Sequence, residues 1–292
     1  MTLNRWLGCH RIDLLDCGST NDEAARLARA GARHGTIVIA ESQRAGRGRD
    51  GRTWASPPGF GLYLSAIVRP PLPLALVPPM TLAIGVGLCD TLRAHGAHAE
   101  LKWPNDALVD GKKIAGVLVE AQSQGTRLEA VIIGIGVNLG ARSESGPLHP
   151  GLGARSESGP LHPGLGARSE SGLLQPGLGG TLPDELADRA TTLAAVSNRP
   201  VDRERFLATL LEHLEHWLDR YSAGGMPAVA AAWQERMAPR LVARASTTAG
   251  TSLVGELAGL DGDGALLLRD HAGELHRVRS GDVEVMRDTQ PA

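Results

Sequence analysis

Short apolar runs alternate with helical patterns along the first half of the chain. The β-branched run 36–40 and the longer run 62–69 have the length and composition of buried strands. An alanine-rich stretch at 24–30 and the apolar positions of 80–95 fit helices. Further strands are expected at 11–15, 112–120 and 127–136. Because strands joined by hairpins lie apart from the helices, the pattern predicts an α+β domain over a mostly antiparallel sheet.

A repetitive segment interrupts this pattern after residue 139. Residues 140–152, 153–165 and 166–178 are near-identical copies of one 13-residue unit rich in Gly, Pro and Ser. Such a composition cannot bury enough apolar surface to offset the entropy of ordering, so a disordered insertion is expected over 140–178. Helical patterns then resume at 202–221, where one apolar stripe is present, and at 227–237.

From about residue 238 the pattern changes to short strands, and a small β domain is expected there. The strands expected are 240–245, 252–260, 265–269 and 275–278, with a hairpin turn at 261–264. The length of these strands and the regular spacing of the turns between them are typical of an SH3-like barrel. We therefore predict a catalytic domain at 1–237 and a C-terminal β domain at 238–292.

The most distinctive polar stretch, 41–54, follows the strand at 36–40 directly. It places four arginines among three glycines, namely Arg44, Arg47, Arg49 and Arg52 with Gly46, Gly48 and Gly51. Glycine lets the backbone approach a ligand closely, and guanidinium groups offer paired donors to carboxylate or phosphate. We predict an anion-binding loop that is mobile until its anion binds. A solvated basic turn is the alternative.

A second polar cluster is the stretch KWPND, from Lys102 to Asp106. Pro104 excludes helix there and fixes a corner at the end of a strand. The hairpin signal Asp110-Gly111 follows, so Asp106 and Lys113 are expected to face each other across a hairpin. A carboxylate beside an amine suits the handling of a phosphate and an acid. A cross-strand ion pair with little energetic value is the alternative.

Composition and charge limit the partners and the cellular compartment that this protein is expected to have. The net charge of −2 over 292 residues gives no overall basic field for nucleic acid. The three cysteines show no C-x-x-C spacing, which argues for a reducing compartment and against a zinc site. The N-terminus does not have the pattern of a signal peptide, and the apolar stretch 72–89 is broken by prolines and reads as too short to span a bilayer. A cytoplasmic protein is expected.

Four motifs occur in one order along the chain: GRGRDGRTW from Gly46, KWPND from Lys102, KIAGVLVE from Lys113 and GIGVNL from Gly134. In order and spacing they resemble the bacterial biotin–protein ligases. The resemblance implies a catalytic domain like those of class II aminoacyl-tRNA synthetases and biotin synthetase, with a small C-terminal SH3-like β barrel. Only 18 residues precede Ser19, so the chain resembles the members that lack an N-terminal DNA-binding domain.

The resemblance also implies roles for individual residues. It places biotin and its adenylate against Ser19, Thr20, Asn21, Gln43, Gly46, Arg47, Gly48, Arg49, Trp54 and Lys113. Asn105 and Asn138 are implied on the nucleotide side, and no protein ligand to a metal is implied. Lys113, Arg49 and Asp106 are the implied catalytic residues, with Lys113 between the biotin carboxylate and the α-phosphate.

The activity implied is ATP-dependent formation of biotinyl-5′-AMP, followed by transfer of biotin to a lysine of a biotin carboxyl carrier protein. ATP with Mg²⁺ is the implied co-substrate, and a monomer or weak homodimer is expected. A lipoate or octanoate ligase-like acyltransferase is the alternative enzyme. A biotin-sensing repressor is a less favoured alternative, because the residues before Ser19 leave no room for a helix-turn-helix domain.

Overall fold

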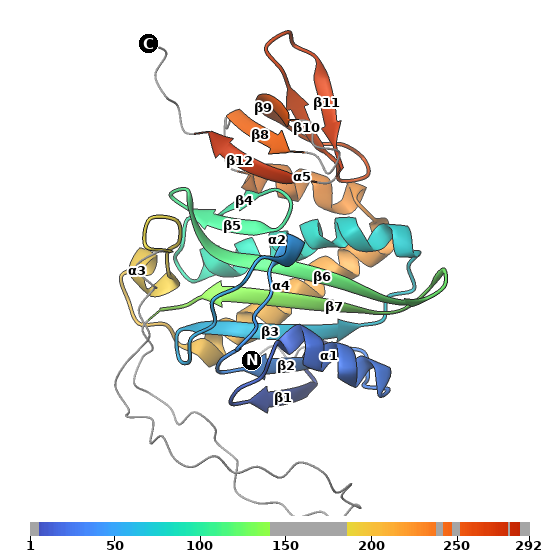
Figure 1. Cartoon of the computed structure of the whole chain (residues 1–292), viewed down its shortest axis with the longest axis vertical. Helices are drawn as coiled ribbons and strands as arrows, with labels where there is room; N and C mark the ends of the chain where they lie inside the picture. Colours follow the sequence, from blue (N-terminus) through green and yellow to red (C-terminus); the bar gives the residue numbers. More distant parts are fainter. Residues whose placement is uncertain (1–5, 141–185, 238–241, 247–251, 280, 287–292) are drawn as a thin grey trace, which may run out of the picture.

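A seven-stranded sheet forms the centre of the larger part of the molecule, in the order β1-β2-β3-β7-β6-β5-β4 (Figure 1). The computed structural model describes residues 6–140, 186–237, 242–246, 252–279 and 281–286. The strands of this sheet are β1 (His10–Leu14), β2 (Thr36–Ala40), β3 (Gly61–Val68), β4 (Glu100–Lys102), β5 (Asp106–Val109), β6 (Lys112–Gln124) and β7 (Arg127–Asn138). Only β1 and β2 pair in parallel, so the expectation of a mostly antiparallel sheet is confirmed.

The sheet is covered on both faces, which explains why β3 is apolar along its length except for Ser65. All eight residues of β3 are buried. Helix α1 (Thr20–Arg29) packs on one face, over β3 and β7, where Ala24, Ala28 and Ile67 belong to one buried cluster. Leu62 and Leu64 belong to a larger cluster that includes residues of α2 and α4. Successive β3 side chains therefore alternate between two cores.

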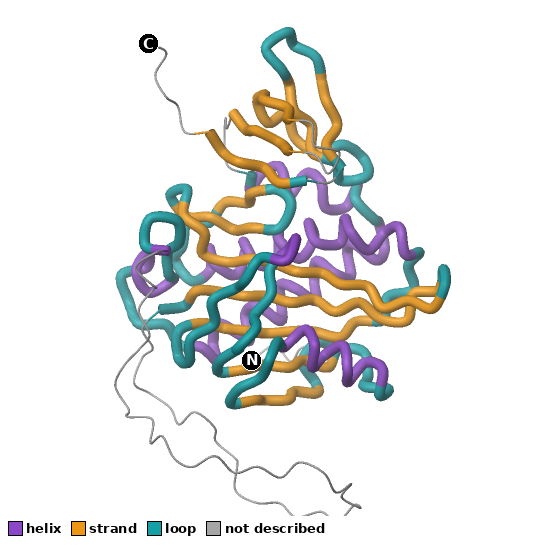
Figure 2. Tube along the Cα trace, viewed as in Figure 1, coloured by secondary structure: helices purple, strands orange, loops and turns teal. Residues whose placement is uncertain are grey.

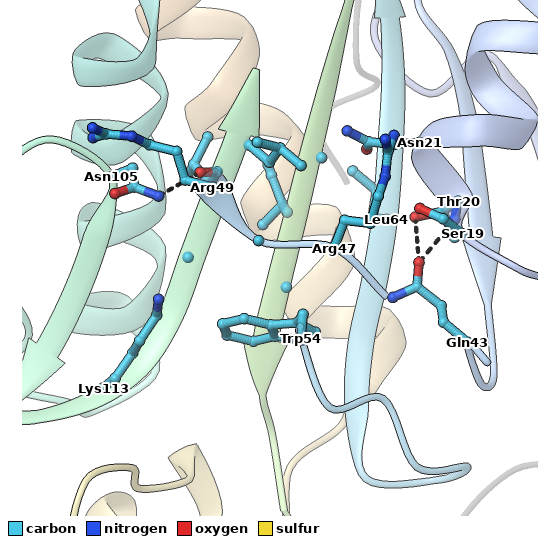
Figure 3. A pocket seen from close by; sticks show the side chains of 17 residues that line it. Ser19, Thr20, Asn21, Gln43, Arg47, Arg49, Trp54, Leu64, Asn105 and Lys113 are labelled. Atoms are coloured by element: carbon cyan, nitrogen blue, oxygen red, sulfur yellow. Dashed lines mark hydrogen bonds between the residues drawn. The ribbon is translucent and has the colours of Figure 1, made fainter. Parts of the chain in front are cut away.

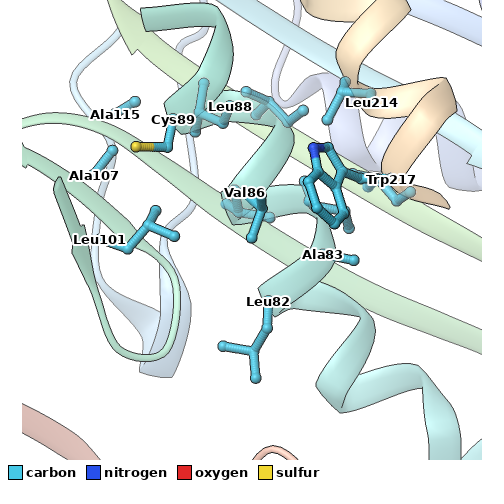
Figure 4. Packing of buried hydrophobic residues seen from close by; sticks show 14 of the residues in the cluster. Leu82, Ala83, Val86, Leu88, Cys89, Leu101, Ala107, Ala115, Leu214 and Trp217 are labelled. Carbon is cyan, nitrogen blue, oxygen red and sulfur yellow. The ribbon is translucent and has the colours of Figure 1, made fainter. Parts of the chain in front are cut away.

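Helix α2 (Val77–Ala94) lies between the sheet and the long helix α4 (Arg203–Gly224), and α5 (Pro227–Arg236) packs beside both. Figure 4 shows apolar side chains of α2 against Leu214 and Trp217 of α4. With the short η2 (Leu74–Leu76) before it, the segment Leu74–Ala94 is long and apolar enough to cross a membrane, and most of it is buried inside the protein. The sequence-based judgement that this stretch is too short was wrong, because Pro73 precedes η2 and Pro78 and Pro79 lie in the first turn of α2, where they break no internal bond.

A second sheet follows α5, with five antiparallel strands in the order β11-β10-β9-β8-β12. Its strands are β8 (Val242–Ser246), β9 (Ser252–Leu260), β10 (Leu266–Arg269), β11 (Leu275–Val278) and β12 (Asp282–Met286). The hairpin turn expected at 261–264 joins β9 to β10, where Gly264 N donates to Asp261 O. This sheet contacts the larger part of the molecule at Trp103, whose Nε1 donates to Gly264 O at 3.2 Å.

Most elements lie where the sequence predicts them, within a few residues at each end (Figure 2). Five short ones were not expected: β5, α3 (Leu193–Ser197), β12 and the turns η1 (Arg49–Gly51) and η2. The expected disordered insertion at 140–178 lies outside the described residues from 141 onward. The boundary at 237/238 between two domains stays a prediction.

Candidate active site

A cavity of about 50 Å³ opens on the α1 side of the large sheet, beneath the arginine loop (Figure 3). The start of α1, the loop 43–54 and the middle of β3, β6 and β7 contribute its walls. It is lined by Ser19, Thr20, Asn21, Gln43, Arg47, Gly48, Arg49, Trp54, Leu64, Asn105, Lys113, Gly116, Val117, Leu118, Gly134, Ile135 and Gly136. Ten of the thirteen residues named from the sequence are therefore brought together.

Three glycines on β6 and β7 form the floor of the cavity. Gly116 and Gly136 are directly opposite each other in the sheet, and the indole of Trp54 lies over this pair. A Cβ on Gly136 would fall 2.4 Å from Trp54 Cε2, whereas one on Gly116 would fall 3.2 Å from Trp54 Cζ3. A Cβ on Gly134 would fall 2.2 Å from Asn21 Oδ1. The GIGVNL motif therefore provides close approach for two side chains of the site.

The side chain of Gln43 is fixed between the start of α1 and the end of the arginine loop. Its Oε1 accepts from Thr20 N at 2.8 Å, and Thr20 Oγ1 lies 3.1 Å from the same oxygen (Figure 3). Its Nε2 donates to Ser56 Oγ at 2.8 Å, and Ser56 Oγ in turn donates to Trp54 O. These bonds set which end of the amide faces the cavity. Ser19, which immediately precedes α1, makes no side-chain capping bond to the helix.

Ser65 is a polar side chain at the centre of β3 that the sequence analysis did not single out. It is fully buried, and its Oγ lies 2.8 Å from Thr20 Oγ1 and 2.6 Å from Asn21 Oδ1. A buried hydroxyl without a partner is costly, so the pairing matters for both elements. The one signal in the sequence was a serine inside an otherwise apolar strand.

The arginine loop folds as a small hairpin. Arg47 and Thr53 form a bridge, and Trp54 N donates to Gly46 O at 2.9 Å. Gly46 does not line the cavity. A Cβ there would lie 2.4 Å from Trp54 O, so this glycine allows the base of the hairpin to close.

Only two of the four loop arginines reach the cavity. Arg47 pairs with Asp22 at 2.8 Å and with Glu120 at 3.0 Å. Arg49 donates to the backbone oxygen of Gly281, just before β12. Arg44 pairs with Asp16, and Arg52 lies 3.8 Å from Asp50, both with largely exposed side chains. The cationic character of the cavity therefore comes from Arg47, Arg49 and Lys113.

Lys113 and Asp106 face each other across the hairpin as expected, with Nζ 2.6 Å from Oδ1. The ammonium also lies 5.2 Å from the centroid of the Trp54 ring, a cation–π distance. Asp106 does not line the cavity itself and reaches it only through Lys113. The ion pair anticipated as a structural alternative is thus present, and it directs an amine toward the site.

The two residues expected on the nucleotide side, Asn105 and Asn138, lie in different places. Asn105 lines the cavity, and its Nδ2 donates to Val117 O at 2.9 Å. Asn138 is buried outside the cavity, where its Nδ2 lies 3.2 Å from Thr191 O and 3.4 Å from Lys113 O. Asn138 therefore links the ends of β6 and β7 to the segment before α3, and its implied role at the nucleotide stays a prediction.

The described lining residues include no histidine or cysteine. Cys17 lies next to the site, bridged in the backbone to Gln43, and burial raises the pKa of its thiol to about 11. The thiol is therefore neutral at pH 7 and unsuited to nucleophilic catalysis. The arrangement instead combines an uncharged polar wall, the indole of Trp54 and three cations. The polar wall consists of Ser19, Thr20, Asn21 and Gln43. Such a site can hold an uncharged polar ring at one end and a carboxylate or phosphate at the other.

Two protein-family models match the chain. The Biotin/lipoate A/B protein ligase family matches residues 18–138, and the Biotin protein ligase C terminal domain matches residues 246–286. Every residue of the cavity and the four motifs, apart from the last residue of GIGVNL, fall within the first match. Fold and site together define a ligase of the biotin/lipoate class.

Relatives over nearly the whole chain narrow this class. A bifunctional ligase/repressor BirA of Bacillus spizizenii is 32% identical over 96% of this chain and 75% of its own. A biotin–[acetyl-CoA-carboxylase] ligase of Paracoccus denitrificans is 30% identical over 87% of this chain and 92% of its own. The biotin protein ligase of Aquifex aeolicus, in complex with biotin and ATP, superposes with a TM-score of 0.71 at 25% identity, covering 96% of this chain and all of that one. The chain belongs to the biotin protein ligase family.

Proposed function

We propose that this protein is an ATP-dependent ligase that activates biotin as biotinyl-5′-AMP and transfers it to a lysine of a biotin carboxyl carrier protein. One observation carries the proposal. The polar wall of Ser19, Thr20, Asn21 and Gln43 and the cations Arg47, Arg49 and Lys113 line one cavity. A ureido ring with two N–H donors and one carbonyl matches the wall, and a carboxylate matches the cations. The Aquifex relative that superposes on the whole chain binds biotin and ATP.

In the first step, an oxygen of the biotin carboxylate attacks the α-phosphorus of ATP, and the bond to the bridging oxygen breaks to release pyrophosphate. Two anions must approach each other, so the barrier is largely electrostatic, and fixed cations that match the transition state lower it. Lys113 is assigned between the carboxylate and the α-phosphate. Its ion pair with Asp106 and its position over Trp54 hold the ammonium in place.

Mg²⁺ is proposed as part of the nucleotide co-substrate. We propose that this cation is held chiefly by nucleotide phosphates and water, as is usual for Mg²⁺.

In the second step, the amine of a carrier lysine attacks the acyl carbon of the mixed anhydride. The C–N bond forms, the C–O bond to AMP breaks, and the amine loses a proton. Asp106 is the proposed base or orienting group for that amine. The arginine loop is assigned to cover the adenylate and exclude water between the steps.

The size of the cavity supports a loop that moves. Ligand pockets usually measure roughly 300–1,000 Å³, several times the 50 Å³ found beneath the loop. Arg47, Arg49 and Trp54 all belong to this loop, so its displacement widens the cavity at the roof. The empty loop is held by ion pairs between partly exposed groups, which contribute little stability.

Labelled biotin and labelled lipoate, each with ATP and a biotin carboxyl carrier domain, test the proposal. Incorporation of biotin and not of lipoate is the expected result. Preferred incorporation of lipoate would support the alternative acyltransferase. Biotin-dependent exchange of pyrophosphate into ATP measures the first step without any carrier. We further propose a cytoplasmic protein, in keeping with three cysteines that show no C-x-x-C spacing. We also propose that it acts as a monomer or weak homodimer.

A further inference from the structure

Glu120 occupies a junction between the two ends of the cavity. It lies on β6 and does not line the cavity, yet one carboxylate oxygen, Oε2, contacts both Asn21 and Arg47. Asn21 belongs to the polar wall at the start of α1, and Arg47 belongs to the arginine loop.

The contact with Asn21 determines the orientation of an amide. Asn21 Nδ2 donates to Glu120 Oε2 at 2.6 Å, while its Oδ1 accepts from Ser65 Oγ at 2.6 Å. A flipped amide would place Oδ1 against the carboxylate, oxygen against oxygen. Glu120 and Ser65 therefore leave one N–H and one lone pair of this amide for a ligand, in a fixed order. A ureido group, which carries donors and an acceptor, is sensitive to that order.

The contact with Arg47 restrains the loop. Arg47 Nη2 lies 3.0 Å from Glu120 Oε2 and 2.8 Å from Asp22 Oδ1. Two carboxylates thus hold one guanidinium. The Arg47 side chain is 43% exposed and that of Glu120 36%, so this restraint is weak and can be exchanged for a ligand anion.

We propose that Glu120 is a positioning residue that orients the Asn21 amide for the ureido ring and holds Arg47, and with it the arginine loop, in the empty enzyme. The inference rests on the proposed function for its ligand. Glu120 touches neither substrate nor reacting atoms, and it acts through these two neighbours.

The chain offers variants that separate the two contacts. Glu120→Ala removes both, whereas Glu120→Gln keeps a neutral acceptor for Asn21 and removes the charge that faces Arg47. Asp22→Asn weakens the hold on Arg47 without touching the amide of Asn21. Glu129→Gln, at an exposed position at the start of β7, is the matched control. None of these changes creates or removes a tryptic site.

Pyrophosphate exchange gives separate KM values for biotin and ATP, and limited trypsin digestion without ligand gives the cleavage rate after Arg47. For Glu120→Ala we expect KM for biotin to rise by roughly tenfold, as for loss of a charge-assisted hydrogen bond, with KM for ATP changed by less than about twofold. Cleavage is expected to rise by up to roughly fivefold in Glu120→Ala, Glu120→Gln and Asp22→Asn. KM for biotin is expected to stay near wild type in Glu120→Gln, Asp22→Asn and Glu129→Gln.

Equal rises in both KM values for Glu120→Ala would indicate general damage to the fold and overturn the proposal. A Glu120→Gln enzyme as defective toward biotin as Glu120→Ala would overturn the amide-orienting role. Unchanged cleavage after Arg47 in both Glu120 variants would overturn the restraint on the loop. If Glu120→Ala does not fold, the Gln variant and Ser65→Ala, which releases the other side of the same amide, carry the test. A wild-type protein without biotin-dependent exchange would refute the proposed function instead, and the digestion comparison would still decide the role of Glu120 at the loop.

Discussion

Gly136→Ala tests whether the glycine floor positions Trp54. A methyl group there would lie 2.4 Å from Trp54 Cε2, while ordinary contacts begin at 3.4 Å, so the indole must move by about 1 Å. Misplacement of a site group by about 1 Å costs on the order of a hundredfold in rate. We therefore expect kcat/KM for pyrophosphate exchange to fall by about tenfold to a hundredfold.

Stability is expected to change far less. Overpacking of a closed core costs about 1–3 kcal/mol, but Trp54 belongs to a loop that can yield outward. The melting temperature of Gly136→Ala should therefore fall by only a few degrees, about what 1 kcal/mol causes in a protein of this size. A thermal melt beside the exchange assay separates a displaced indole from an unfolded protein.

Gly116→Ala is the matched control, because Gly116 faces Gly136 in the neighbouring strand under the same ring. Its Cβ would meet Trp54 Cζ3 and Lys113 Cε, each at 3.2 Å, a contact that small shifts relieve. We expect at most a severalfold loss of exchange. Near-normal exchange in Gly136→Ala, or an equal loss in Gly116→Ala, would refute the reasoning.

Four further predictions follow from the same geometry. Lys113→Ala should lose adenylate formation by at least about a hundredfold with an unchanged melting temperature, since it removes the cation placed between two anions; near-normal pyrophosphate exchange would contradict its role. Biotin, and biotinyl-AMP more strongly, should slow tryptic cleavage after Arg47 and Arg49, and equal rates with and without ligand would contradict a loop that orders on binding. Cys17 should react with iodoacetamide at pH 8 much more slowly than exposed Cys9, because burial raises its thiol pKa to about 11 and little thiolate is present; mass spectrometry of the two peptides reads the result. The chain should form no sequence-specific complex with a biotin-operon promoter in a gel shift, given its net charge of −2; a biotin-dependent complex would favour the repressor alternative.

Periodicity alone determined most of the secondary structure of this protein. The runs that became β2, β6 and β7 are apolar and rich in β-branched residues over five residues or more, and the run that became β3 is apolar except for Ser65. The apolar stripe of α4 is long enough to determine which face of the helix is buried. Several short elements were not predicted, because a stretch of three to five residues is too short to show a clear periodicity. β5 forms because it pairs with β4 and β6, and β12 because it pairs with β8.

The residues of the site were largely determined by sequence as well, since the loop arginines, Trp54 and Lys113 stand in motifs with recognisable chemistry. What only the tertiary structure decided is how they are held. Ser65 and Glu120 looked like an ordinary strand residue and an ordinary strand end until the sheet brought them to Asn21, 44 and 99 positions away. Asn138, by contrast, lies outside the cavity and bonds to the backbone at the start of β6 and before α3. Hydrogen bonds between residues so far apart depend on how the strands and helices pack against one another, and that packing is decided by the whole chain and not by the residues next to each partner.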